Sequence, residues 1–125
     1  MKTHYTLMSA ADREMTTQLV RQIAQTVIST HAADRMAQKG VTGREIEICL
    51  TYGSVIEVHD EAGEWRAVIR HAFGMPKVAV CVVIGLMTGT IVTTWKNAGS
   101  DNHKTLNTFA YEKVNLASIL GKELI

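Results

Sequence analysis

The sequence lacks the features that mark secreted, membrane-spanning or strongly basic proteins. Its 125 residues include one proline, two cysteines and 6% aromatic residues, and the formal net charge is only +1. A long nucleic-acid-binding surface makes a domain more basic than this, so binding by bulk electrostatics is not expected. The longest apolar run, at 78–87, is too short to span a bilayer.

The two cysteines indicate a reducing environment. Cys49 and Cys81 lie inside apolar runs and belong to no C-x-x-C pair, which predicts buried, reduced thiols. The first 15 residues have no apolar core of signal-peptide length. We therefore expect a cytoplasmic protein without membrane association.

Metal and cofactor motifs are also missing from the sequence. The five histidines show no His-x-His or His-Glu-x-x-His spacing, and only Asp34 offers a second ligand near His31. We expect no metal. Because no glycine-rich stretch has the setting of a phosphate loop, we expect no nucleotide cofactor either. Neither cysteine has a basic neighbour in sequence, so a cysteine nucleophile is not expected.

The first half of the chain shows helical periodicity in three segments. Residues 10–28 repeat apolar side chains at helical spacing and predict one helix, with Leu19, Ile23 and Val27 packed on a sheet. A short helix at 31–39 follows, with Ser29 or Thr30 as its cap and Gly40 at its end. Thr42 and Glu45 form a capping box for a third helix that Gly53 ends.

The second half changes to an alternation of period two. It predicts strands at 54–60, 64–73, 77–86 and 90–97, joined by connections short enough for antiparallel hairpins. A polar loop and a short helix are expected in the tail. We thus predict a single α+β domain over 1–125, with N-terminal helices at 9–53, a four-stranded antiparallel β-meander at 54–97 and a C-terminal loop and helix at 98–125.

Two motifs carry a resemblance to a known family. H-A-A-D-R-M at 31–36 and T-G-T-I-V-T at 88–93 resemble a family of small, uncharacterised bacterial and phage domains with a His-Ala-x-x-Arg-Met signature. That family looks similar to the barnase, colicin and RelE-like ribonuclease fold, in which helices precede an antiparallel sheet. The resemblance covers roughly 27–97 and implies a toxin that cuts RNA without a metal.

Metal-independent RNA cleavage sets clear chemical requirements. It needs a base for the 2′-hydroxyl, an acid for the leaving 5′-oxygen and cations for the phosphorane. Histidine suits the proton transfers and arginine suits the phosphate. The catalytic candidates are His31, Arg35, Arg70, Thr94 and His103, and the substrate-binding candidates are Arg66, Trp95 and Lys96. Thr93 is the alternative to Thr94, and Tyr111 is the alternative to Trp95 for stacking on a base.

Each candidate also has an ordinary structural interpretation. His31 fits a surface histidine as well as a base, and Arg35 fits a pair with Glu57 or Glu64 as well as a phosphate site. The two arginines of the second predicted strand suit a solvated sheet face. Tryptophan is more often a core residue than a stacking platform, and threonine is a common strand former.

Two functions from different classes follow. The first is a metal-independent endoribonuclease of the toxin type, with RNA and an antitoxin or immunity protein as partners. The second is a non-enzymatic phage or bacterial interaction protein on the same fold, which the near-neutral charge favours. A second copy of the chain is a further candidate partner; the oligomeric state and the RNA target stay open.

Overall fold

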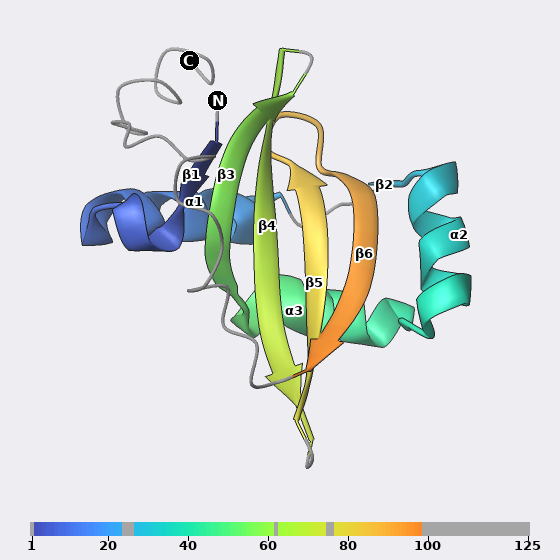
Figure 1. Cartoon of the computed structure of the whole chain (residues 1–125). Coiled ribbons are helices and arrows are strands. Elements are labelled where there is room, and N and C mark those ends of the chain that lie inside the picture. The colour runs from blue at the N-terminus through green and yellow to red at the C-terminus, as the bar shows by residue number, and fades with distance from the viewer. Residues whose placement is uncertain (1, 24–26, 62, 75–76, 99–125) are drawn as a thin grey trace.

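The computed structural model describes residues 2–23, 27–61, 63–74 and 77–98. The helices lie in the first part of the chain and the four long strands follow them, as shown in Figure 1. In chain order the elements are β1 (Lys2–His4), the 3₁₀ helix η1 (Tyr5–Leu7), α1 (Ala10–Gln22), β2 (Val27–Ile28), α2 (Thr30–Lys39), α3 (Gly43–Tyr52), β3 (Ser54–Glu61), β4 (Glu64–Phe73), β5 (Val78–Gly85) and β6 (Thr90–Ala98).

The helix starts follow the predicted capping signals. The Ser29 hydroxyl accepts a hydrogen bond from the Ala32 amide at 3.0 Å, which starts α2. At α3, Thr42 and Glu45 each accept a hydrogen bond from the other's backbone amide, at 3.1 and 2.9 Å. Gly40 ends α2 in the left-handed conformation, with φ 66°, which glycine adopts at little cost. These caps confirm the predicted boundaries of the second and third helices.

The prediction of one helix over 10–28 is wrong. α1 ends at Gln22, and Val27 and Ile28 form a strand instead. The buried face of α1 carries Asp12, Thr16 and Val20, while Val27 is 65% exposed. The apolar residues after Gln22 continue the helical period in the sequence, but Val27 and Ile28 pair with β6. Tertiary pairing has therefore overridden the local helical pattern.

The prediction of a four-stranded antiparallel meander is also wrong. The sheet has six strands in the order β1-β3-β4-β5-β6-β2, and the β2–β6 pair is parallel. The four predicted strands lie at its centre as antiparallel neighbours. Two N-terminal strands of three and two residues were not predicted, and each adds one edge to the sheet. The fold is therefore α+β with a mixed sheet. Figure 1 shows one face of this sheet.

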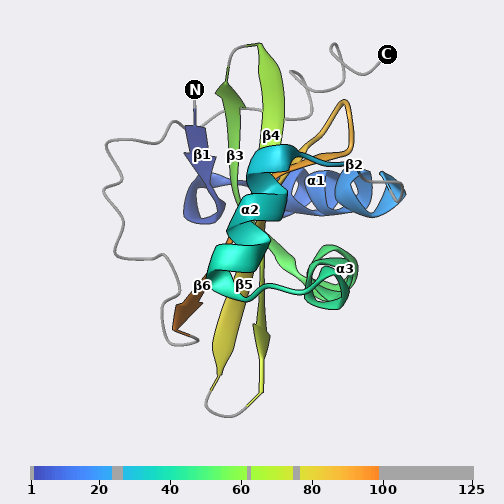
Figure 2. The same ribbon diagram turned by 90° about the vertical axis from the view of Figure 1, so that its right-hand side faces the viewer.

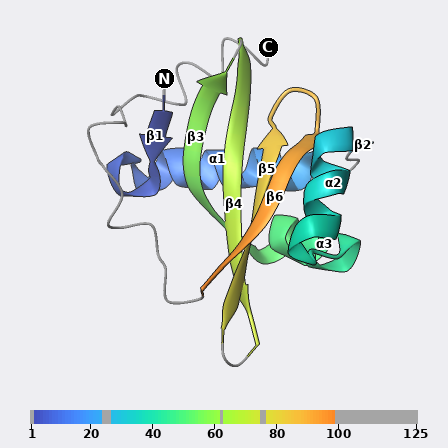
Figure 3. The same ribbon diagram turned by 45° about the vertical axis from the view of Figure 1, so that its right-hand side comes forward.

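The sheet has two chemically different faces. On the first face α1 and α3 cover the main core, as the edge-on view of Figure 2 shows. That core includes Val55, Val58, Ala67, Ile69, Val80, Val82 and Ile84. The second face carries a smaller apolar cluster of Ile56, Val68, Cys81 and Val83. Helix α2 lies at the edge of the sheet beside β6, seen most clearly in Figure 3.

The alternation predicted for β4 is confirmed. Trp65, Ala67 and Ile69 belong to the main core, and Val68 belongs to the cluster on the second face. Since alternate side chains of a strand point to opposite faces, Arg66 and Arg70 share the second face with Val68. The predicted loop and helix of the C-terminal tail lie outside the described residues, which end at Ala98.

Candidate functional site

Several ionisable side chains lie on the second face of the sheet, and four of them are neighbours on β3 and β4; His4 of β1, opposite Glu57, and Glu64 of β4 lie on the same face. Glu57 and His59 come from β3, and Arg66 and Arg70 come from β4. In the antiparallel register His59 is opposite Arg66, and Glu57 is opposite Val68. Directly opposed residues share a face, so all four lie on the same side as the Val68 cluster. We call Glu57, His59, Arg66 and Arg70 the sheet-face site.

A β-bulge in β3 creates this arrangement. The register shifts between Val55 and Glu57, where one strand carries an extra residue. Strict alternation would put Val55 and Glu57 on one face. The bulge instead places Val55 and Val58 in the main core, whereas Ile56 belongs to the second-face cluster. Glu57 can therefore join the arginines without removing an apolar side chain from the core.

Glu57 and His59 form a close acid–imidazole pair. The Glu57 Oε2 atom lies 3.0 Å from the His59 Nδ1 atom, and the two side chains are only 14% and 9% exposed. In such a setting a charge–charge or charge–dipole interaction is stronger than in water. The contact has the distance of an ion pair, and it places the carboxylate beside Nδ1, which leaves Nε2 as the second ring nitrogen. The pair has the chemistry of a proton carrier next to a carboxylate.

The two arginines flank the position opposite Glu57. Arg66 and Arg70 stand two residues to either side of Val68 along β4, so each is a diagonal neighbour of Glu57. Diagonal neighbours are about 7–8 Å apart, within reach of long side chains. A guanidinium binds two oxygens of a phosphate at once. The sheet-face site therefore combines a proton carrier with two phosphate-binding groups.

β6 adds an aromatic side chain to the same face. Arg70 is opposite Cys81, and Cys81 is opposite Trp95, so the three form a row across three strands. Two strand spacings put the Arg70 and Trp95 backbones about 10 Å apart. Trp95 is partly buried and packs against the second-face cluster, and Thr93 faces the same way opposite Val83. A base can stack on such an indole.

The residues predicted on α2 lie elsewhere. His31 is exposed and Arg35 is half-buried on a helix beyond β6. β4 and β6 are two strand spacings apart, about 10 Å, and α2 lies farther out (Figure 3). The structure thus does not bring His31 and Arg35 together with Arg70. Within the described ranges Arg35 forms no ion pair; Glu57 and Glu64 instead contact His59 and Arg66.

Two other candidates face away from the sheet-face site. Thr94 is fully buried, and its hydroxyl donates a 2.7 Å hydrogen bond to the Cys81 carbonyl oxygen. Lys96 is opposite Val80 of the main core and lies 3.8 Å from the Glu45 carboxylate. His103 and Tyr111 lie outside the described residues. Of the candidates chosen from sequence, the second face gathers Arg66, Arg70, Trp95 and the alternative Thr93.

Sequence reasoning missed Glu57 and His59 as members of the site. A signal for them existed, because the tight turn that the sequence predicts at 61–63 fixes which residues of two neighbouring strands oppose each other. Counting back from that turn pairs His59 with Arg66. The bulge near Glu57 has no comparable sequence signal, since no glycine marks it.

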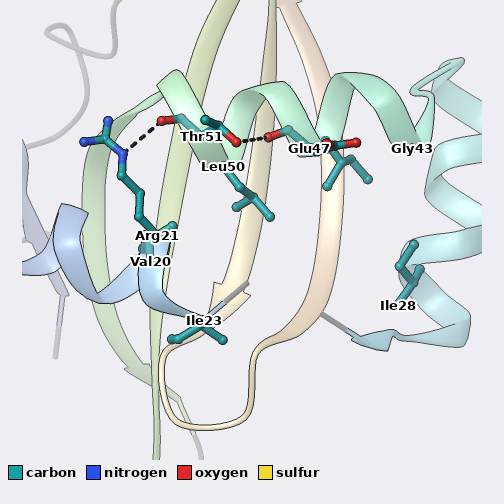
Figure 4. Close-up of a pocket in the computed structure, with 9 residues that line it drawn as sticks. Val20, Arg21, Ile23, Ile28, Gly43, Glu47, Leu50 and Thr51 are labelled. Atoms are coloured by element: carbon teal, nitrogen blue, oxygen red, sulfur yellow. Dashed lines mark hydrogen bonds between the residues drawn. The ribbon is translucent and has the colours of Figure 1, made fainter. Parts of the chain in front are cut away.

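A cavity lies on the other side of the sheet, away from the sheet-face site. It has a volume of about 520 Å³ between α1 and α3, and Figure 4 shows its lining. Its walls are mainly apolar, from residues such as Val20, Ile23 and Leu50. The Arg21 side chain at its rim donates to the Thr51 carbonyl oxygen at 2.9 Å. None of the sequence-predicted site residues lines it, and its polar groups do not form an acid–base set.

The described part of the chain shows no candidate metal centre. No cluster of three or more His, Cys, Asp or Glu side chains suited to a metal ion occurs in it. Over the same residues, no helix is both long and apolar enough to cross a membrane.

The two cysteines are free and buried. Desolvation raises the pKa of the Cys49 thiol to about 12 from 9.0, and the nearby Cys81 adds to this rise. The Cys49 thiol also donates toward the Ile69 and Val80 carbonyl oxygens, each at 3.5 Å. A buried thiol that keeps its proton is a poor nucleophile, because the thiolate is the reactive form.

The raised pKa of Cys49 predicts a specific loss of stability at high pH. Above about pH 9 the unfolded thiol releases its proton while the folded thiol keeps it. The free energy of unfolding should therefore fall as pH rises from 9 toward 12, by up to about 1.4 kcal/mol per pH unit. Urea unfolding of the parent and of Cys49→Ala at pH 8, 9, 10 and 11 measures this component. The difference in unfolding free energy between the parent and Cys49→Ala should become smaller as the pH rises. If the two free energies change in parallel with pH, the prediction is wrong.

Comparison with known proteins places the chain in a family. A family model described as a domain of unknown function, DUF4258, matches residues 28–96, more than half of the chain. The chain belongs to this family. No curated protein and no solved structure matches it. The matched DUF4258 segment begins within β2 and includes Glu57, His59, Arg66, Arg70 and Trp95. α1 and β1 lie outside this segment.

Proposed function

We propose that this DUF4258 protein is a metal-independent endoribonuclease that acts through the sheet-face site. The observation that carries the proposal is the Glu57–His59 pair, 3.0 Å apart, on the same face as Arg66 and Arg70. Its two motifs resemble a family of small bacterial and phage domains that looks similar to the barnase, colicin and RelE-like ribonucleases, and this resemblance supports the same chemistry. The proposal moves the proton carrier from His31 on α2 to His59 on the sheet.

The proposed reaction uses the RNA itself as nucleophile. The His59 Nε2 atom accepts the proton of the 2′-hydroxyl, and the 2′-oxygen attacks the adjacent phosphorus. The bond from phosphorus to the 5′-oxygen breaks, and the leaving oxygen takes a proton from water. The products are a 2′,3′-cyclic phosphate and a 5′-hydroxyl. Glu57 holds the imidazole in position and stabilises its protonated form.

The remaining residues of the face bind the substrate. Arg66 and Arg70 stabilise the negative charge that grows on the phosphorane oxygens. Trp95 stacks on a base next to the cleaved bond, which favours single-stranded RNA because its bases are accessible. A net charge of +1 fits a short contact of a few nucleotides better than a long groove. We further propose a cytoplasmic site of action and an inhibitory antitoxin or immunity protein.

Cleavage of a defined RNA tests the proposal. Purified protein should cut a single-stranded RNA oligonucleotide in EDTA and leave 2′,3′-cyclic phosphate ends, identified by mass spectrometry. The matched control is the same oligonucleotide with 2′-O-methyl groups, which cannot supply the nucleophile and should stay intact. Free RNA and RNA on ribosomes are both assayed. Cleavage that needs a metal, or that cuts the 2′-O-methyl strand, would contradict the mechanism.

The alternative is a non-enzymatic interaction protein. The low net charge and the burial of Glu57 and His59 favour it. Under this alternative the parent leaves every RNA intact and forms a stable complex with another protein of its host. If the parent protein cuts RNA and the substitution His59→Gln abolishes the cutting, this alternative is excluded.

A further inference from the structure

The connection between β5 and β6 reaches the sheet-face site through Glu64. The Thr88 hydroxyl donates a 3.1 Å hydrogen bond to Glu64 Oε1, and the same hydroxyl accepts one from the Thr90 amide at 3.2 Å. The Gly89 amide closes the turn by donating to the Gly85 carbonyl oxygen at 2.9 Å. The first part of the T-G-T-I-V-T motif thus fixes one oxygen of the Glu64 carboxylate.

The other Glu64 oxygen contacts Arg66. The Arg66 Nη2 atom donates to Glu64 Oε2 at 3.3 Å, and the two side chains are 21% and 28% exposed. A guanidinium is planar and carries its donors in a rigid fork, so a carboxylate on one nitrogen sets the plane of the others. Glu64 therefore influences where the Arg66 donors point.

Gly85 leaves the space in which this carboxylate lies. Gly85 is opposite Arg66 in the antiparallel register. A Cβ atom at Gly85 would collide with the Glu64 carboxylate and would lie 2.7 Å from the Thr88 hydroxyl. Both contacts are with the ends of side chains that can rotate away, and no backbone atom is involved. A side chain at Gly85 would thus displace Glu64 while the sheet stays intact.

From these contacts we infer that Glu64, seated over Gly85 and tied to Thr88, is a positioning residue that orients Arg66 toward the phosphate of bound RNA. The inference rests on the proposed function. An arginine side chain has several rotatable bonds and loses entropy when it is fixed by substrate. A guanidinium that is already oriented loses less when the phosphate arrives. Glu64 acts through Arg66 and does not itself touch the reacting atoms.

A double-mutant cycle on binding tests the inference without cleavage. The probe is a single-stranded oligonucleotide with 2′-deoxy sugars, which the protein can bind but not cut. Glu64→Gln and Gly85→Ala should each weaken its binding by about 3- to 10-fold, the effect of one lost hydrogen bond to a charged group. In an Arg66→Ala background neither change should weaken binding further, since coupled residues are not additive.

A matched glycine change and a second measurement complete the test. Gly43→Ala places a methyl group in open space and should leave binding unchanged. The ¹H–¹⁵N heteronuclear NOE of the Arg66 Nε–H group should fall in Glu64→Gln and Gly85→Ala, and remain at the parent value in Gly43→Ala. An unchanged NOE, or equal losses with and without Arg66, overturns the positioning role. A parent that binds the probe but leaves RNA uncut overturns the proposed cleavage and not the role of Glu64.

Discussion

Replacing His59 with Gln should lower the rate of RNA cleavage by about 10²- to 10⁴-fold, the contribution of one positioned general base. The amide keeps a polar side chain of similar length in a site that is only 9% exposed. It cannot accept a proton at neutral pH. Glu57→Gln should also lower the rate, because an amide cannot stabilise the protonated imidazole as a carboxylate does. Single-turnover kinetics on an RNA oligonucleotide measure both effects.

Two other histidines provide matched controls. His71 belongs to β4, but its register partner is Val80 of the main core, so it lies on the first face. His31 is exposed on α2. His71→Gln and His31→Gln should keep the parent rate. Chemical denaturation at the assay temperature verifies that each variant is folded. If His31→Gln abolishes cleavage while His59→Gln does not, the base is on α2 and the sheet-face site is not the active site.

Replacing Ile69 with Ala should cost about 2–5 kcal/mol of unfolding free energy. Ile69 is 1% exposed in the main core, and its carbonyl oxygen accepts a hydrogen bond from the Cys49 thiol of α3. The truncation leaves a cavity where β4 meets this helix, which the close-packed surroundings can fill only in part. Urea unfolding followed by circular dichroism gives the difference.

Ile28→Ala is the matched control for this prediction. Ile28 is 43% exposed in β2, so the same chemical change should cost less than about 1 kcal/mol. The sequence pattern places Ile28 on the buried side of a long helix. If that were its position, Ile28→Ala and Ile69→Ala would both lower the unfolding free energy strongly. Equal losses at Ile69 and Ile28 would therefore contradict the strand assignment of Val27 and Ile28.

The sequence predicted those parts of the fold that depend on near neighbours in the chain. The capping residues Ser29, Gly40 and Thr42 each act on a backbone or side-chain group three or four residues away, and the four central strands are joined by short connections. β1 and β2 could not be predicted in this way. Their three and two residues are too few to show a period, and what makes them strands is pairing with β3 and β6.

The candidate site was predictable to a similar extent. Placing Arg66 and Arg70 on one face needed only the alternation of a single strand. Adding Glu57 needed the bulge of the neighbouring strand, which depends on how two strands fit together. His31 and Arg35 were chosen because they align on one helix, but alignment on a helix does not specify which part of the sheet that helix meets.

Both edges of the sheet come from the beginning of the chain, and this has a consequence for synthesis on the ribosome. Lys2–His4 pairs with residues 57–59, and Val27–Ile28 pairs with residues 90–91. The three helices therefore leave the ribosome before any of the four central strands of the sheet, β3 to β6. Contacts so distant in sequence form slowly, because a long loop must close first. Strand β1 can pair as soon as β3 has been made, but β2 and the sheet-facing surface of α2 must wait for β6, the last described strand to leave the ribosome.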